Sequence, residues 1–327
     1  MDNVCIVISV IENLELEPNT NFRYFDWTIT NQVEDVKKII PNLDLFKKEV
    51  GAITVDAFSN KTLAYLMYEL NDKETHINIL HDLQNGLGGL LCLLWFFKNN
   101  AVYNSKIFSQ KITDHYVGTS YRDVINSNAQ GEYEKLFLSA DSIEKIKDDK
   151  FMDYAKAVFT TVEEKIEPIE DLAPNINNII SGTKGRAIEI YYPYFSRIQR
   201  AFLLLQIAQK TRFLPMKIAF YTNILECLLI DQVSSELSFR LQLYTASFIG
   251  ENKDEKELIR TNVNLAYNIR SKFFHGSGLK ETVEKLQTLS LQMDNIVRRI
   301  MIKAINNHDI INDNKELGNY FKSIVFS

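Results

Sequence analysis

Five segments in the second half of the chain repeat their apolar residues at helical spacing, and this pattern constrains the fold more than any other feature. The segments run over about 187–211, 214–231, 235–249, 254–274 and 280–306. Only a few residues connect each segment to the next, as antiparallel neighbours in a helical bundle require. The sequence therefore predicts a helical domain over 186–306.

Turn and cap residues support these boundaries. Pro215 suits the first turn of a helix, and Ser234 or Ser235 can cap the segment that follows. Gly250 and Gly276 each stand where a helix ends, the position at which glycine is most favoured. We expect the helices to begin and end near these residues.

The first half of the chain mixes strand and helix signals. VCIVISVI (4–11) and FRYFDWTIT (22–30) have the β-branched and aromatic content of strands, and the turn residues at 18–20 between them predict a hairpin or small sheet. Residues 77–98 and 141–162 have helical spacing. We therefore expect a mixed α+β N-terminal domain.

Proline, asparagine and glycine concentrate over 167–185, which is the best candidate for a domain boundary. The prediction is a mainly α protein with an α+β domain at 1–185, the helical domain at 186–306 and a C-terminal tail at 307–327.

Charge is distributed unevenly between these parts. Residues 1–185 carry 18 basic and 28 acidic side chains, whereas residues 186–305 carry 17 basic and 11 acidic ones. A local positive field suits a polyanionic partner such as RNA, although two differently charged solvated surfaces explain the counts equally well.

We expect neither secretion nor membrane insertion. The apolar start at 4–11 has no basic residue before it, and the apolar run at 87–97 is about half the length that spans a bilayer. The three cysteines, Cys5, Cys92 and Cys227, have neither disulfide-framework nor zinc-site spacing. We expect a cytoplasmic protein.

The motif RSKFFHG (270–276) ends the fourth helical segment. It places Arg270 and His275 five residues apart, which supplies a fixed cation for phosphate and a proton carrier for neutral pH. On a helical wheel an apolar stripe surrounds Arg270; its members are Ile259, Val263, Ala266 and Phe273. A cation in such a stripe needs an anionic partner or a cleft, and Glu226 is the carboxylate we expect because it also interrupts an apolar run.

The other face of this segment is polar. Asn264, Asn268, Ser271 and His275 lie along it. In an ideal helix Arg270 and His275 point about 140° apart, so one straight helix cannot aim both at a single phosphorus atom. Either the last turn loosens before Gly276, or two chains together form the site.

Residues from about 187 to 305 resemble a HEPN domain of the ApeA-like kind. The marks are NILECLLI with Glu226, the following segment 234–250, and RSKFFHG, which fits the Arg, four to six residues, His motif of that family. The resemblance implies a helical bundle that dimerises and cleaves RNA without a metal or other cofactor, in antiviral defence or as a toxin.

The roles implied by the resemblance are specific. Arg270 stabilises the phosphorane and His275 moves the proton, with Glu226, Asn268 and Ser271 in support. The 2′-OH attacks the adjacent phosphorus and leaves a 2′,3′-cyclic phosphate. The alternative is a catalytically silent HEPN module that binds RNA or nucleotide, or that serves as an assembly scaffold.

Other motifs are weaker. His76 and His81 lack the HExxH spacing of a zinc helix, and the glycines at 85–89 and 181–186 match no phosphate-binding loop. We interpret the histidines as structural and the glycines as backbone features.

Overall fold

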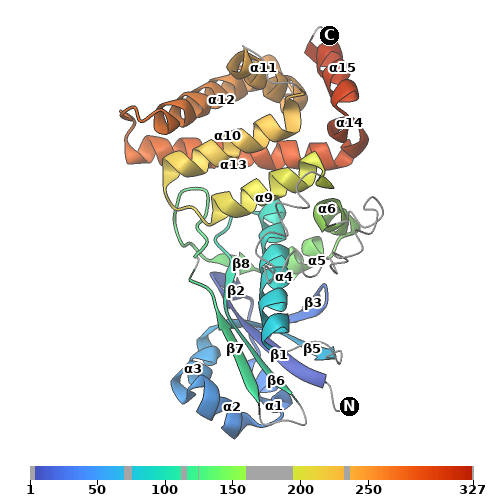
Figure 1. The fold of residues 1–327 in the computed structure, drawn as a ribbon, viewed down its shortest axis with the longest axis vertical. Helices are drawn as coiled ribbons and strands as arrows, with labels where there is room; N and C mark the ends of the chain where they lie inside the picture. Colours follow the sequence, from blue (N-terminus) through green and yellow to red (C-terminus); the bar gives the residue numbers. More distant parts are fainter. Residues whose placement is uncertain are drawn as a thin grey trace, which may run out of the picture.

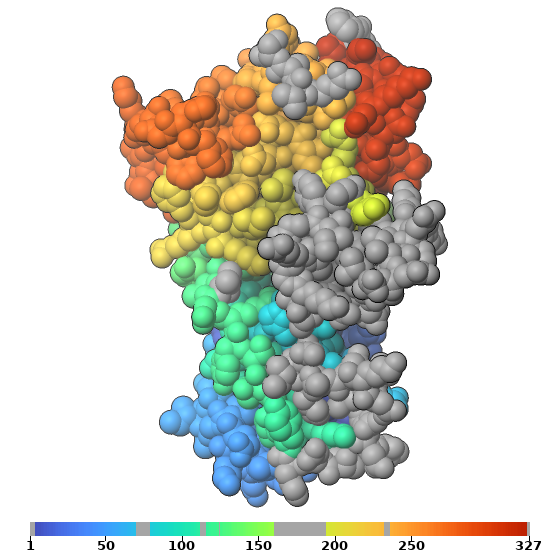
Figure 2. Space-filling model, viewed as in Figure 1, coloured from blue at the N-terminus to red at the C-terminus, as the bar shows by residue number. Residues whose placement is uncertain are grey.

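The computed structural model describes residues 4–69, 76–111, 116–123, 125–159, 194–231 and 236–325. An antiparallel sheet with flanking helices forms one end of the molecule, and a helical bundle forms the other (Figures 1 and 2). The prediction of a mainly α protein, in which a mixed α+β part precedes the helices, is confirmed.

The sheet has six strands in the order β3-β4-β5-β1-β6-β7, and every neighbouring pair is antiparallel. Its strands are β1 (Val4–Glu12), β3 (Asn21–Tyr24), β4 (Trp27–Thr30), β5 (Thr62–Glu69), β6 (Tyr103–Lys111) and β7 (Val117–Tyr121). A separate parallel pair joins β2 (Leu14–Leu16) to β8 (Leu136–Leu138).

Strand β1 is apolar along almost its whole length because both faces of the sheet are covered. Val7 and Ile11 belong to the core on the side of α4 (His76–Phe97), and Ile6 and Ile8 belong to a second core on the opposite side. The second core is closed by α1 (Val33–Ile39), α2 (Leu43–Val50), α3 (Ala52–Asp56) and the short 3₁₀ helix η1 (Ala57–Asn60).

The sequence predicted a hairpin or a small sheet for segments 4–11 and 22–30, and the structure has the sheet: both segments belong to it, but they are not neighbours in it. Both edges of β1 are already paired, with β5 and β6. The segment 22–30 instead folds on itself as the hairpin β3–β4, and Phe25 in its turn has a φ of +53°.

Helices α5 (Ala140–Ile146) and α6 (Asp149–Phe159) replace the single helical segment expected over 141–162, as far as the described residues reach. The helix expected at 77–98 is α4, which continues through its glycines without a break.

The bundle contains the five predicted helical segments, four of them close to their predicted positions; the first begins at Arg197, and residues 187–193 of its expected range lie outside the described residues. They are α9 (Arg197–Gln209), α10 (Leu214–Leu229), α11 (Leu237–Ile249), α12 (Lys253–Phe274) and α13 (Val283–Asn306). Helix α10 is buried along most of its length because it packs against the four others.

The caps follow the sequence in part. Pro215 lies in the first turn of α10, and Gly276 follows α12 with a φ of +72°, a left-handed conformation that glycine adopts without strain. Gly250 ends α11 with a φ of −78° instead, in extended backbone. Ser234 and Ser235 lie outside the described residues.

The segment assigned to a tail contains two further helices, α14 (His308–Asn312) and α15 (Asn314–Val325). The α15 residue Phe321 is fully buried, and its ring stacks on Tyr244 of α11 with centroids 4.4 Å apart. Residues 308–325 therefore extend the bundle.

The proposed boundary at 167–185 lies outside the described residues. On either side of it, one continuous hydrophobic cluster contains side chains of the sheet, α4 and the bundle. No helix within the described ranges is both long and apolar enough to cross a membrane.

A buried polar network joins the two parts at Asp294 of α13, which is fully buried. Its carboxylate accepts hydrogen bonds from Trp95 Nε1 of α4 at 2.5 Å and from the Tyr221 hydroxyl of α10 at 3.0 Å. Its second oxygen pairs with Arg298, whose Nε also donates to the Trp95 carbonyl at 2.8 Å. Burial raises the pKa of Asp294, and Arg298 opposes that rise.

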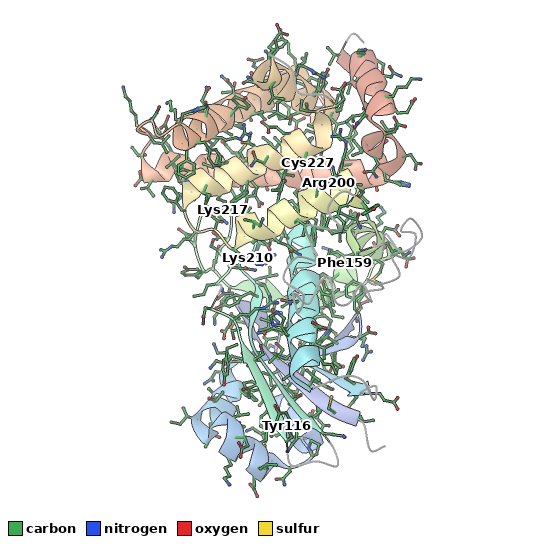
Figure 3. All side chains as sticks on the ribbon, viewed as in Figure 1. Tyr116, Phe159, Arg200, Lys210, Lys217 and Cys227 are labelled. Carbon is green, nitrogen blue, oxygen red and sulfur yellow. The ribbon has the colours of Figure 1, made fainter. Side chains whose placement is uncertain are left out.

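Lys217 of α10 lies beside this network and is also fully buried (Figure 3). Its amine donates to the carbonyl of Ala208 at 2.8 Å and to that of Ser127 at 3.2 Å. Burial lowers the pKa of Lys217 to about 7.

We expect Asp294→Ala to lower the free energy of unfolding by about 3–5 kcal/mol, because it leaves Arg298 as a half-buried cation and strips Trp95 and Tyr221 of their acceptor. Urea unfolding measures this change. Asp309→Ala, at an exposed carboxylate on α14, is the control and should change stability by less than about 0.5 kcal/mol. Equal costs for the two variants would contradict the role assigned to Asp294.

We expect Lys217 to make stability rise with pH between about 7 and about 10.5. In that range the unfolded chain holds a proton on Lys217 that the folded chain has released, since the pKa falls from 10.5 to about 7 on folding. Urea unfolding at several pH values, for the wild type and Lys217→Met, isolates this contribution because other titrating groups cancel in the difference. Parallel pH profiles for the two proteins would rule it out.

Candidate active site

Helix α12 carries the motif and has well-defined ends. Asn252 caps its start by accepting a hydrogen bond from the Glu255 backbone at 3.0 Å, and Asp254 and Glu255 place negative charge in the first turn. At the other end His275 is the C-cap residue, and the turn at Gly276 stops the helix. The motif therefore occupies the last turn of a long helix.

Arg270 meets the carboxylate that the sequence predicted. Its Nη1 lies 3.0 Å from Oε1 of Glu226, and its Nη2 donates to Oε2 at 3.2 Å. The two side chains are 25% and 18% exposed, so this two-point ion pair between α12 and α10 is largely shielded from water. The expected Arg270–Glu226 pair is confirmed.

The pair lies where two apolar helix faces meet. Ala266 and Ile269 precede Arg270 on the buried side of α12, and the guanidinium also lies over the Tyr267 ring, 5.6 Å from its centroid. Burial raises the pKa of Glu226, while Arg270 opposes that rise. Within the described residues the buried Nε of Arg270 and the buried Oε1 of Glu226 have no hydrogen-bond partner, so the contact from Nη2 to Oε2 is the hydrogen bond of the pair.

His275 lies in a different environment. It is exposed, and its backbone N–H donates to the Ser271 carbonyl at 3.0 Å as part of the helix end. Across the described part of the chain, no side chain or backbone group bonds to its ring. The imidazole is therefore accessible to a ligand, whereas Arg270 is held against α10.

The supporting residues form the predicted polar face. Asn264 and Asn268 are exposed, and Ser271 is half-buried. The Asn264 oxygen accepts a hydrogen bond from Gln242 of α11 at 3.1 Å, and Asn268 Nδ2 lies 3.5 Å from the same oxygen. This face adjoins α11, so it is distinct from the Arg270 face, which adjoins α10.

Sequence reasoning missed a group of aromatic rings at the motif, two of which are exposed. Phe213, before α10, lies with its ring centroid 5.6 Å from that of Phe273, which lies 5.2 Å from Phe274. Phe213 and Phe274 are more than half exposed. The signal was present as the FF pair inside RSKFFHG, but only the fold brings Phe213 beside it.

The weaker candidates gain no support from the described residues, and the glycines at 181–186 lie outside them. His81 is exposed on α4, and the side chain of His76 lies outside the described residues. Among the described residues, no group of three or more His, Cys, Asp or Glu side chains is placed to hold a metal ion.

We expect Glu226→Ala to lower the free energy of unfolding by roughly 1–3 kcal/mol, because it leaves the half-buried Arg270 without its carboxylate. The matched control is Glu257→Ala. It breaks the exposed ion pair between Glu257 and Arg260, both on α12, and should cost less than about 0.5 kcal/mol. A double-mutant cycle with Arg270→Ala, measured by urea unfolding, gives the coupling energy. A coupling near zero would show that the pair contributes nothing.

Comparisons of the chain with family models, with curated proteins and with solved structures found no match. The functional argument therefore rests on the geometry of α10 and α12.

Proposed function

We propose that the chain is a metal-independent endoribonuclease of HEPN type. The observation that carries this proposal is the placement of Arg270 and His275 on the last turn of α12, with Arg270 oriented by Glu226 and His275 accessible. A cation fixed by a carboxylate and a free imidazole nearby are the two groups that metal-free RNA cleavage needs. A role in antiviral defence or as a toxin follows from the resemblance.

In the proposed reaction the 2′-oxygen of the RNA forms a bond to the adjacent phosphorus, and the bond from phosphorus to the 5′-oxygen breaks. The 2′-OH proton leaves to solvent, and the His275 imidazolium gives a proton to the departing 5′-oxygen. Arg270 stabilises the additional negative charge on the phosphorane through its guanidinium donors. The products are a 2′,3′-cyclic phosphate and a 5′-OH.

A homodimer fits this chemistry better than a single chain. Arg270 faces α10 and His275 is exposed at the helix end, so the two groups of one chain diverge. Two chains that meet at their motifs would supply an arginine from one and a histidine from the other. The exposed rings of Phe213 and Phe274, together with the half-buried ring of Phe273, offer apolar surface beside the motif that such a contact would cover.

One observation favours the alternative of a silent binding or scaffold module. Both terminal nitrogens of Arg270 are engaged by Glu226, which is what a purely structural ion pair between two helices would look like. In that case the basic surface would bind RNA or nucleotide without cleavage.

Incubation with mixed RNA in EDTA separates the two proposals. We expect the wild type to cleave RNA and His275→Ala to lose about 10²- to 10⁴-fold in rate, the usual range for losing a proton-transfer group. Arg270→Ala should lose activity as well. The matched control is His308→Ala, which removes an exposed histidine on α14 and should leave the rate unchanged.

The chemistry of the product ends is the second readout. Cyclic phosphates from the wild type, together with loss in both motif variants, would support the nuclease. Cleavage that persists in His275→Ala would refute the assigned role. RNA binding without cleavage, at equal affinity in all variants, would favour the silent module.

A further inference from the structure

Strand β7 is an outer strand of the six-stranded sheet (Figure 1). It pairs with β6 along one edge. Within the described residues, no strand pairs with its other edge. A free strand edge presents backbone N–H and C=O groups to which a further strand can bond.

The register identifies the residues of β7 whose backbone groups face this free edge. In an antiparallel pair, residues that bond to the neighbouring strand alternate with residues that point away from it. The backbone N–H of Arg122, directly after β7, donates to the carbonyl of its opposite residue Ser105 at 2.9 Å. Every second residue counted back from there bonds to β6. The backbone groups of Val117, Thr119 and Tyr121 therefore point outward, and across the described part of the chain no hydrogen bond engages them.

Strand β7 lacks the features that keep edge strands from pairing with other chains. Natural edge strands usually carry a charge, a proline or a bulge. The opposite edge strand of the sheet, β3, has the exposed Arg23. By contrast β7 has the sequence VGTSY, with no charge and no proline, and its register with β6 is unbroken. Two of its outward residues, Thr119 and Tyr121, are exposed, so this edge is open to a partner.

The outward residues of β7 are complementary to a second copy of the same strand. When two copies pair antiparallel about a twofold axis, outward residues must lie opposite outward residues. With Thr119 opposite Thr119 of the second chain, Val117 of each chain lies opposite Tyr121 of the other. A Thr–Thr pair and a pair of an aromatic with a β-branched residue are both favourable across strands. This register also leaves none of the outward N–H and C=O groups without a bond.

We propose that two copies of this chain associate through β7, by antiparallel pairing centred on Thr119, so that their two sheets become one. The strand has five residues, so the contact is small, and small contacts are typical of reversible association that depends on concentration. The contact lies at the sheet end of the molecule, away from the bundle (Figure 1). It therefore leaves the motif on α12 accessible.

Cysteine cross-linking of the full chain tests the register, with the wild type as the background. We expect Thr119→Cys to form a disulfide between two chains on mild oxidation, because residues opposite each other in a bonded pair have Cα atoms about 5.5 Å apart. Tyr121→Cys is the matched control on the same strand. Its two copies would lie about 13 Å apart and should not cross-link. The double variant Val117→Cys/Tyr121→Cys should cross-link, because it places the two cysteines opposite each other.

Sedimentation velocity over a range of protein concentrations measures the association itself. We expect Thr119→Lys to weaken it about tenfold, because two opposed like charges replace a favourable Thr–Thr pair. The matched control is Met67→Lys, which adds the same charge at an exposed position of β5 and should associate like the wild type. Circular dichroism verifies that both variants fold.

Three results would overturn the proposal. They are no cross-linking of Thr119→Cys above the wild-type background, equal cross-linking of Thr119→Cys and Tyr121→Cys, and equal association of Thr119→Lys and the wild type. Chains that meet only at their motifs, or a β7 edge that pairs with a strand of another protein, would give the first and third results. The proposed nuclease activity would stand in either case, because its test measures cleavage and not association at β7.

Discussion

The buried carboxylate of Asp294 is the constraint on which the arrangement of the whole chain depends. A fully buried Asp is unfavourable unless donors surround it, and its donors come from three helices. Trp95 belongs to α4, which covers the sheet, Tyr221 belongs to α10, and Arg298 lies one turn further along α13. The network is complete only when the sheet part and the bundle are packed together. The buried carboxylate of Asp294 therefore favours this packing over any arrangement that leaves it without the Trp95 and Tyr221 donors.

The same junction orients the candidate active site. Tyr221 and Lys217 fix α10 against α13, the end of α9 and the segment around Ser127. Glu226 follows on the same helix, only five residues after Tyr221, and an α-helix transmits that orientation rigidly over so short a distance. The position of Arg270 is therefore set indirectly, through α10, by the contacts of Tyr221 and Lys217.

Sequence reasoning succeeded where a signal is local and failed where the partner is distant. Apolar spacing placed the five bundle helices, and Glu226 and Arg270 were paired because each interrupts an apolar run. Lys217 and Asp294 interrupt apolar runs in the same way, yet the main partner of Asp294, Trp95, is 199 residues away, and no spacing rule connects them. Of the hairpin or small sheet expected for segments 4–11 and 22–30, the structure has the sheet, and the pairing partners of β1 could not be predicted for a related reason. Strands β5 and β6 occupy its two edges through long connections that turn residues cannot reveal.

Arg270 is subject to two opposing requirements. As half of a shielded ion pair it must be neutralised by Glu226, but as a phosphate-binding group it must present positive charge. The Nε of Arg270 has no hydrogen-bond partner among the described residues, but it is buried, so a phosphate would have to reach the terminal nitrogens instead. Those nitrogens lie 3.0 Å and 3.2 Å from the carboxylate oxygens of Glu226. The ion pair thus fixes the position of Arg270 between the helices, and the proposed catalysis requires a phosphate to compete with Glu226 for the guanidinium.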